Sequence, residues 1–170
     1  PDNFLLPDPD LMLASQEDAN DLWIPIQTRR GCAMGCSYCS TGTIEGTITR
    51  KRSPKSVVKW IAKMVSLGVN QFYFVDNTFN VPPSYADSLC RELTRASLKL
   101  KWRCILYPYR LDESLVEAMA KAGCFEVAVG FESANDRVLE GMNKHFRRED
   151  VVRSCSLLGQ YGIRRMGFLL

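Results

Sequence analysis

From Trp23 onward, short apolar segments alternate with longer segments in which apolar residues recur at helical spacing. The clearest helical segment follows Pro54, where the apolar positions share one face between an N-cap Ser53 and a terminating Gly68. The pattern predicts strands at 23–28, 71–76, 100–107, 124–131 and 163–170, and helices at 54–67, 84–96, 112–122, 135–141 and 148–161.

This alternation of apolar strands and helices indicates a parallel sheet with right-handed crossovers. We expect an α/β fold, a partial TIM-like (β/α) barrel with about four β/α units and a fifth strand. The apolar run 167–170 has no helix after it to cover it, although parallel strands are normally covered on both faces. Because a full barrel needs about 200 residues or more, we expect a truncated part of a longer protein.

Residues 1–21 are rich in Pro, Asp and Asn and show no clear period, so we expect an extended lead-in segment there and a folded domain over 22–170. The composition, with 46% hydrophobic and 24% charged residues, is typical of a globular protein. A net charge of +3 is too small to indicate nucleic acid or a membrane surface as a partner. No apolar run approaches the roughly 18 residues that span a bilayer.

The chain has seven cysteines, of which Cys32, Cys36 and Cys39 form a C-x-x-x-C-x-x-C run. The odd number, with the other four scattered in apolar patterns, disfavours a secreted disulfide framework and favours the reducing cytoplasm. Clustered thiolates select iron–sulfur clusters, zinc or copper(I). Structural zinc usually takes four protein ligands, whereas three cysteines leave one iron of a four-iron cluster open. The spacing therefore favours a reactive cluster.

Four polar features follow four of the predicted strands. The cysteine run follows the first strand, Asp76–Asn80 the second, Tyr107–Arg110 the third and Glu132-Ser133 the fourth. Because parallel β/α folds place ligand sites at the carboxyl ends of their strands, we expect these segments to converge in space.

This combination resembles the radical S-adenosylmethionine (radical SAM) superfamily. The hallmark of that family is C-x-x-x-C-x-aromatic-C after the first strand of a barrel, which Cys32, Cys36, Tyr38 and Cys39 match, and the resemblance runs to Leu170. It makes 22–170 the N-terminal part of a radical SAM core domain. Three segments, 76–80, 130–136 and 139–144, are most similar to the branch that often carries an upstream cobalamin-binding domain.

The resemblance implies that Cys32, Cys36 and Cys39 hold a 4Fe-4S cluster whose fourth iron is chelated by the amino and carboxylate groups of SAM. Reductive cleavage of SAM then gives a 5′-deoxyadenosyl radical for hydrogen abstraction or radical-based methylation. It also implies an electron donor such as flavodoxin or ferredoxin, a small-molecule or cofactor-pathway substrate, and cobalamin held by a domain outside this chain. Because the later barrel strands are absent, we expect little or no turnover of substrate by these residues alone.

The resemblance also assigns roles around the cluster. Tyr38 borders the adenine, and the turn at 76–78 accepts hydrogen bonds from the methionyl ammonium. Glu132 and Ser133 meet the ribose hydroxyls or the methionyl carboxylate, and the start of the fifth strand, near Gly167 and Phe168, approaches the adenine. From residue type alone, an Asx turn at 76–80 and a helix N-cap at 132–133 stay open as structural roles. The implied cofactor-binding residues are Tyr38, Asp76, Asn77, Thr78, Glu132, Ser133 and Phe168.

Two other functions also stay open. A radical tRNA methylthiotransferase would need a second cluster domain and an RNA-binding domain outside these residues. The basic runs at 50–52 and 147–148 suit an RNA backbone, although solvated loop charge is the commoner explanation. A non-catalytic iron–sulfur or zinc-binding module would complete its metal site with Cys90 or His145.

Overall fold

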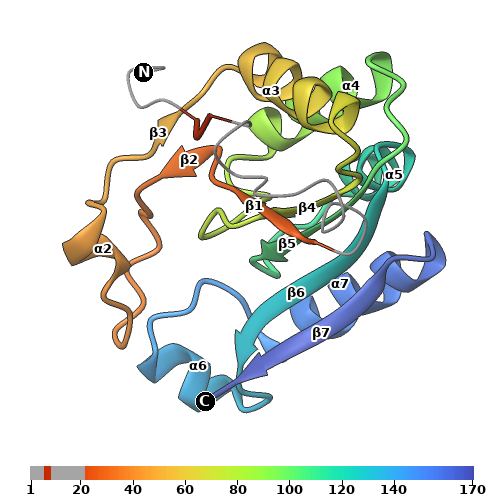
Figure 1. The fold of residues 1–170 in the computed structure, drawn as a ribbon. Coiled ribbons are helices and arrows are strands. Elements are labelled where there is room, and N and C mark those ends of the chain that lie inside the picture. The colour runs from red at the N-terminus through yellow and green to blue at the C-terminus, as the bar shows by residue number, and fades with distance from the viewer. Residues whose placement is uncertain (1–5, 9–21) are drawn as a thin grey trace.

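The computed structural model describes residues 6–8 and 22–170, so most of the expected lead-in segment lies outside the described residues. One five-stranded sheet has the order β1-β4-β5-β6-β7, and every pairing in it is parallel (Figure 1). Its strands are β1 (Ile24–Ile26), β4 (Gln71–Phe74), β5 (Lys101–Leu106), β6 (Cys124–Glu132) and β7 (Arg164–Leu169). The predicted α/β fold with a parallel sheet is confirmed.

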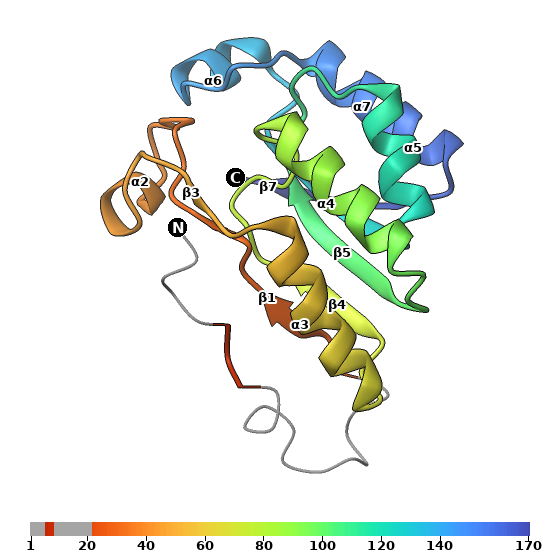
Figure 2. The same cartoon turned by 90° about the horizontal axis from the view of Figure 1, so that it is seen from above.

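Four long helices form a layer on one face of this sheet (Figure 2). They are α3 (Pro54–Ser66), α4 (Pro83–Arg95), α5 (Glu113–Lys121) and α7 (Arg148–Gln160). Local signals account for their starts: the Ser53 hydroxyl accepts a hydrogen bond from the N–H of Ser56, and the Asp112 carboxylate accepts one from Ser114. A shorter helix, α6 (Asp136–Gly141), follows β6 and begins at the N-cap Asn135.

The core lies between the sheet and these helices. Alternate residues of β1, β4, β5 and β6 point into it, whereas all residues of β7 are exposed. The rings of Phe74 and Trp102 meet edge to face, with 5.2 Å between their centres. The buried indole N–H of Trp102 donates to the carbonyl of Ala122, so this large side chain leaves no polar atom unsatisfied. The remaining strand residues point to the opposite face, which we call the inner face.

A small hairpin absent from the sequence prediction precedes the first crossover helix. Its strands β2 (Arg29–Arg30) and β3 (Arg50–Lys51) pair antiparallel, and the loop between them contains the short helix α2 (Thr41–Ile44). Strands of two residues have no hydrophobic period, so pattern analysis gives no signal for them. This hairpin carries the cysteine run on its loop.

Candidate cluster and SAM site

The three clustered cysteines lie on the loop between β2 and α2, beyond the carboxyl end of β1. Cys32 and Cys36 are partly buried, Cys39 is exposed, and all three are free thiols. No group of three or more His, Cys, Asp and Glu side chains among the described residues is close enough to share one metal ion. A cubane cluster does not need such a group, because each cysteine binds a different iron. Three free thiols on one accessible loop therefore fit the donor set of a 4Fe-4S cluster.

The base of this loop passes so close to the hairpin that only glycine fits at position 31. Gly31 has φ +90°, and a Cβ atom there would lie 2.4 Å from the carbonyl oxygen of Ile48. The next residue, Cys32, donates its N–H to the carbonyl of Gly46 at 3.1 Å. The first thiol is therefore positioned by backbone contacts.

Glu45 joins the cysteine loop to the end of β4. Its carboxylate accepts hydrogen bonds from the N–H of Gly31 at 3.1 Å, the amide of Asn77 at 2.7 Å and the amide of Gln27 at 2.9 Å. Burial by itself would raise the pKa of Glu45, but these hydrogen bonds and the nearby charge of Arg30 outweigh it and hold the pKa below its ordinary value. The carboxylate is ionised at neutral pH, where it holds the two segments together.

Asp76 has a structural role that differs from the expected contact with the methionyl ammonium. Its buried carboxylate accepts hydrogen bonds from the N–H and hydroxyl of Thr28 and from the N–H and guanidinium of Arg29. Arg29 also donates to the carbonyls of Phe79 and Val81. Asp76 is enclosed and fully engaged, so it fixes the start of the hairpin to the end of β4.

The segment after α6 supports the other side of the cysteine loop. The N–H of Ser37 donates to the carbonyl of Met142 at 3.0 Å, and the amide of Asn143 donates to the carbonyl of Gly35 at 2.7 Å. The loop and α6 lie side by side although more than 100 residues separate them in sequence (Figures 1 and 2). The segment after α6 thereby holds the backbone on both sides of the second thiol, Cys36.

Tyr38, Glu132 and Lys144 form a hydrogen-bonded group beside the cysteines. The Tyr38 hydroxyl donates to the Glu132 carboxylate at 2.9 Å, and the Lys144 ammonium donates to the Tyr38 hydroxyl oxygen at 2.9 Å. Lys144 also lies 3.5 Å from the same Glu132 oxygen, and only 3% of its side chain is exposed. The predicted positions Tyr38 and Glu132 thus come together through a lysine whose role the sequence analysis missed.

Burial and the charge of Lys144 act in opposite directions on the pKa of Cys36. Burial, together with the neighbouring Cys32 and Cys39, raises the pKa of Cys36, whereas the Lys144 ammonium lowers it, and the net shift is upward. Burial also raises the pKa of the Tyr38 hydroxyl, and its hydrogen bond to Glu132 raises it further. Tyr38 is therefore protonated at neutral pH and acts as a hydrogen-bond donor.

The remaining predicted positions lie around this group. Asn77 donates to Glu45, and Thr78 is half-buried just after it at the end of β4. The Ser133 hydroxyl accepts a hydrogen bond from the N–H of Asn135, which is the N-cap residue of α6. Phe168 lies on β7, opposite Gly130 in the register of the sheet, with an exposed side chain. All of them follow or lie near the carboxyl ends of strands, as expected.

Three residues hold the site together although the sequence did not predict their roles: Arg29, Glu45 and Lys144. Each lies in a loop or a very short strand, where no periodicity marks a buried side chain. Only Lys144 carried a signal in the sequence, because it is the last residue of the segment 139–144 that resembles the family. Charged residues in loops are solvated as a rule, and only their partners in space show these three to be engaged.

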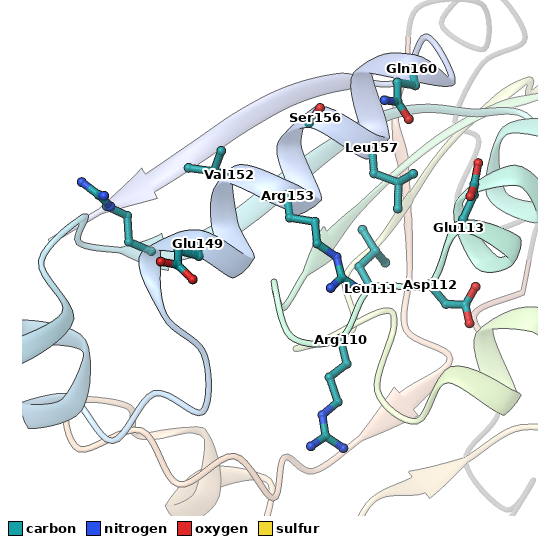
Figure 3. A pocket seen from close by; sticks show the side chains of 11 residues that line it. Arg110, Leu111, Asp112, Glu113, Glu149, Val152, Arg153, Ser156, Leu157 and Gln160 are labelled. Carbon is teal, nitrogen blue, oxygen red and sulfur yellow. The ribbon is translucent and has the colours of Figure 1, made fainter.

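A separate cavity of about 1040 Å³ lies on the helical face, between the start of α5 and α7. In Figure 3, Arg153 reaches from α7 toward Leu111 and Asp112, whereas Arg110 points away from that pair. None of the three cysteines lines this cavity. It is a second surface feature, distinct from the cysteine site.

Comparison with known proteins identifies the family. Residues 26–170 match the Radical SAM superfamily, so the chain belongs to that superfamily. It is 32% identical over 129 residues to the bacteriochlorophyllide d C-12(1)-methyltransferase of Chlorobaculum tepidum, covering 74% of this chain and 28% of that one. It is 24% identical over 143 residues to an uncharacterised methyltransferase of Pyrococcus horikoshii, covering 84% and 31%.

A solved structure shows the same arrangement of elements. The radical SAM methyltransferase TsrM of Kitasatospora setae, solved with tryptophan and a SAM analogue, superposes with a TM-score of 0.81 at 26% identity, covering 88% of this chain and 30% of that one. A second TsrM structure contains cobalamin and a [4Fe-4S] cluster. This chain spans about a third or less of the length of these relatives. No helix in the described part of the chain is long and apolar enough to cross a membrane.

Proposed function

We propose that this chain is the part of a radical SAM enzyme that binds a 4Fe-4S cluster and SAM, in an enzyme related to the cobalamin-dependent methyltransferases. The observation that carries this proposal is the position of three free thiols on one loop beside Tyr38, Glu132 and Lys144. The loop is tied to two strand ends, to β4 through Glu45 and to β6 through Tyr38.

In this proposal, Cys32, Cys36 and Cys39 bind three irons as thiolates and leave the fourth iron to the amino and carboxylate groups of SAM. When bound, the cluster supplies the electron that cleaves SAM to a 5′-deoxyadenosyl radical. The protein positions the cofactor: Tyr38, held by hydrogen bonds at its hydroxyl, presents its ring to the adenine. No described residue donates to the second oxygen of Glu132, which leaves it for a ribose hydroxyl.

Both carboxylate oxygens of Asp76 already accept hydrogen bonds within the protein. The methionyl group of SAM therefore needs other partners. We assign the ammonium to the amide oxygen of Asn77 and the hydroxyl of Thr78, which follow Asp76 at the carboxyl end of β4. The Ser133 hydroxyl accepts one hydrogen bond within the protein and has its own proton free to donate to the methionyl carboxylate. Phe168 offers an apolar surface to the adenine.

We further propose that the sheet belongs to a partial TIM-like barrel and that residues 22–170 are the N-terminal part of a radical SAM core domain. The parallel order of the sheet supports this arrangement, as does the position of its four long described helices on one face (Figure 2). All seven cysteines are free, which suits a reducing cytoplasm. A flavodoxin or ferredoxin as electron donor, a small-molecule substrate and a cobalamin domain outside the chain complete the proposal.

Anaerobic reconstitution with iron and sulfide tests this function. We expect about four irons per chain, an electron paramagnetic resonance signal after reduction, and 5′-deoxyadenosine when SAM is added. Cys36→Ala should lose iron, whereas Cys155→Ala, which removes a free cysteine on α7, should keep it. Full iron content in Cys36→Ala, or one tightly bound zinc without SAM cleavage, would contradict the proposal.

A further inference from the structure

The inner face of the sheet carries an unusual arginine. In β5, residues Lys101, Arg103 and Ile105 alternate with core residues, so their side chains point away from the helices. Arg103 lies opposite Tyr73 of β4 in the register of the sheet. Arg103 is therefore on the inner face, and the cysteine loop lies beyond the edge of the sheet formed by the carboxyl ends of its strands.

Two aromatic rings hold the Arg103 guanidinium. Its central carbon lies 4.5 Å from the ring centre of Trp23 and 4.6 Å from that of Tyr73. Stacking on aromatic faces fixes the plane of a guanidinium and leaves its N–H groups free to donate in that plane. The rings thus orient Arg103 without using its hydrogen-bonding capacity.

The Arg103 Nε atom is buried and has no hydrogen-bond acceptor in the described part of the chain. Buried donors in proteins are nearly always paired, since an unpaired one has lost its water without replacement. Glu126 is its neighbour in the register of the sheet, but Glu126 forms its ion pair with Arg164, at 3.7 Å. Arg103 is therefore a preorganised donor whose Nε atom has no acceptor among the residues that the structure describes.

The surroundings of Arg103 favour a negative charge. Lys101 and Arg164 lie over the ring of Phe125, at 5.3 and 5.2 Å. Among the described residues, these two cations and Arg103 share this part of the inner face with one carboxylate, Glu126. An anion there would be attracted by the local charge as well as by the guanidinium.

We propose that Arg103 binds a carboxylate or phosphate group of the substrate, with Trp23 and Tyr73 holding the guanidinium in place. Both anions match its forked N–H donors. This inference rests on the proposed function, because it assumes that the substrate lies on the inner face below the cluster. Arg103 is three residues from the end of β5, which is about 10 Å along the strand. The substrate is therefore elongated, with its anionic end away from the reacting carbon.

Binding of simple probes tests this site without any cluster. Isothermal titration calorimetry of the chain with heptanoate, heptan-1-ol and inorganic phosphate compares a carboxylate, its uncharged counterpart and a phosphate. We expect heptanoate to bind at least about tenfold more tightly than heptan-1-ol, the effect of one charge-assisted hydrogen-bond pair. Equal binding of acid and alcohol, with no binding of phosphate, would overturn the inference and leave Arg103 as a packing residue.

Variants assign the effect to Arg103. Arg103→Met should abolish the preference for the acid, and Arg103→Lys should restore part of it, because an ammonium keeps the charge but lacks the planar fork. Arg91→Met, on the exposed surface of α4, is the matched control and should bind like the unmodified chain. An unchanged preference in Arg103→Lys and Arg103→Met would contradict the assignment.

The two proposals fail independently. Iron content and 5′-deoxyadenosine formation are measured on the reconstituted unmodified chain, and the acid preference is measured on the chain without a cluster. If the acid preference is present but no cluster forms, the anion site stands and the proposed function fails. If the cluster forms and SAM is cleaved but the acid preference is absent, the proposed function stands and the anion site fails.

Discussion

The ammonium of Lys144 donates a hydrogen bond to the hydroxyl of Tyr38 at 2.9 Å, across 106 positions of sequence. Tyr38 is the aromatic residue of the cysteine motif, and Lys144 belongs to the loop after α6. Their contact, shared with Glu132, joins the start of the fold to the end of β6. Tertiary contacts therefore position the cysteine loop in addition to the glycine at its base.

Lys144→Met should destabilise the protein by about 3 kcal/mol, because it leaves the nearly buried Glu132 carboxylate without its cation. Lys121→Met removes an exposed lysine paired with Glu117 and should cost less than about 0.5 kcal/mol. Urea unfolding followed by circular dichroism measures both. Equal urea midpoints for the two variants would show that Lys144 does not stabilise the fold.

Asp76→Asn should destabilise the fold by about 3–5 kcal/mol, since the buried Arg29 guanidinium, 3.0 Å away, loses its counter-charge. Asp87→Asn is the control, because Asp87 forms an exposed pair with Arg91 that is worth less than about 1 kcal/mol. Thermal unfolding distinguishes them. A melting temperature of Asp76→Asn close to that of Asp87→Asn would restore Asp76 as a candidate for ligand binding.

Gly31→Ala and Gly46→Ala separate two effects at the base of the cysteine loop. Both glycines have positive φ, +90° and +84°, so either alanine costs about 1–2 kcal/mol in backbone strain. Only Gly31→Ala also brings Cβ against the Ile48 carbonyl, whereas a Cβ at Gly46 meets no atom within 4 Å. We expect a larger loss of unfolding free energy, and of iron after reconstitution, in Gly31→Ala. The reverse order would be inconsistent with this packing.

Glu45 should make stability depend on pH in the acidic range. Its folded-state pKa lies below the ordinary value of 4.5, so its stabilising effect is present above pH 4.5 and is lost as the pH falls through the folded-state pKa. Unfolding free energies measured from neutral pH downward should show this loss. In Glu45→Gln the same acidic decline should be shallower, and an identical slope in both proteins would exclude Glu45 as its source.

Local patterns predicted the strands and helices because each long element repeats its apolar positions. The predicted strand 23–28 was too long, since β1 ends at Ile26 and the chain then turns into the hairpin. The edge position of β1 explains how Pro25 fits within it, as a proline removes a ladder donor only where a neighbour needs it. Short elements and loop contacts escaped prediction because they have no period.

The amino-acid sequence by itself determined the alternating α/β fold, the cysteine motif and the family, because these depend on the order and spacing of residues along the chain. The tertiary structure decided which polar residues serve the site. It paired Asp76 with Arg29, brought Lys144 to Tyr38 and left the Nε atom of Arg103 without an acceptor in the described part of the chain. Those outcomes depend on distances between residues far apart in sequence, and burial in three dimensions determines whether a charged side chain is paired, solvated or free to bind.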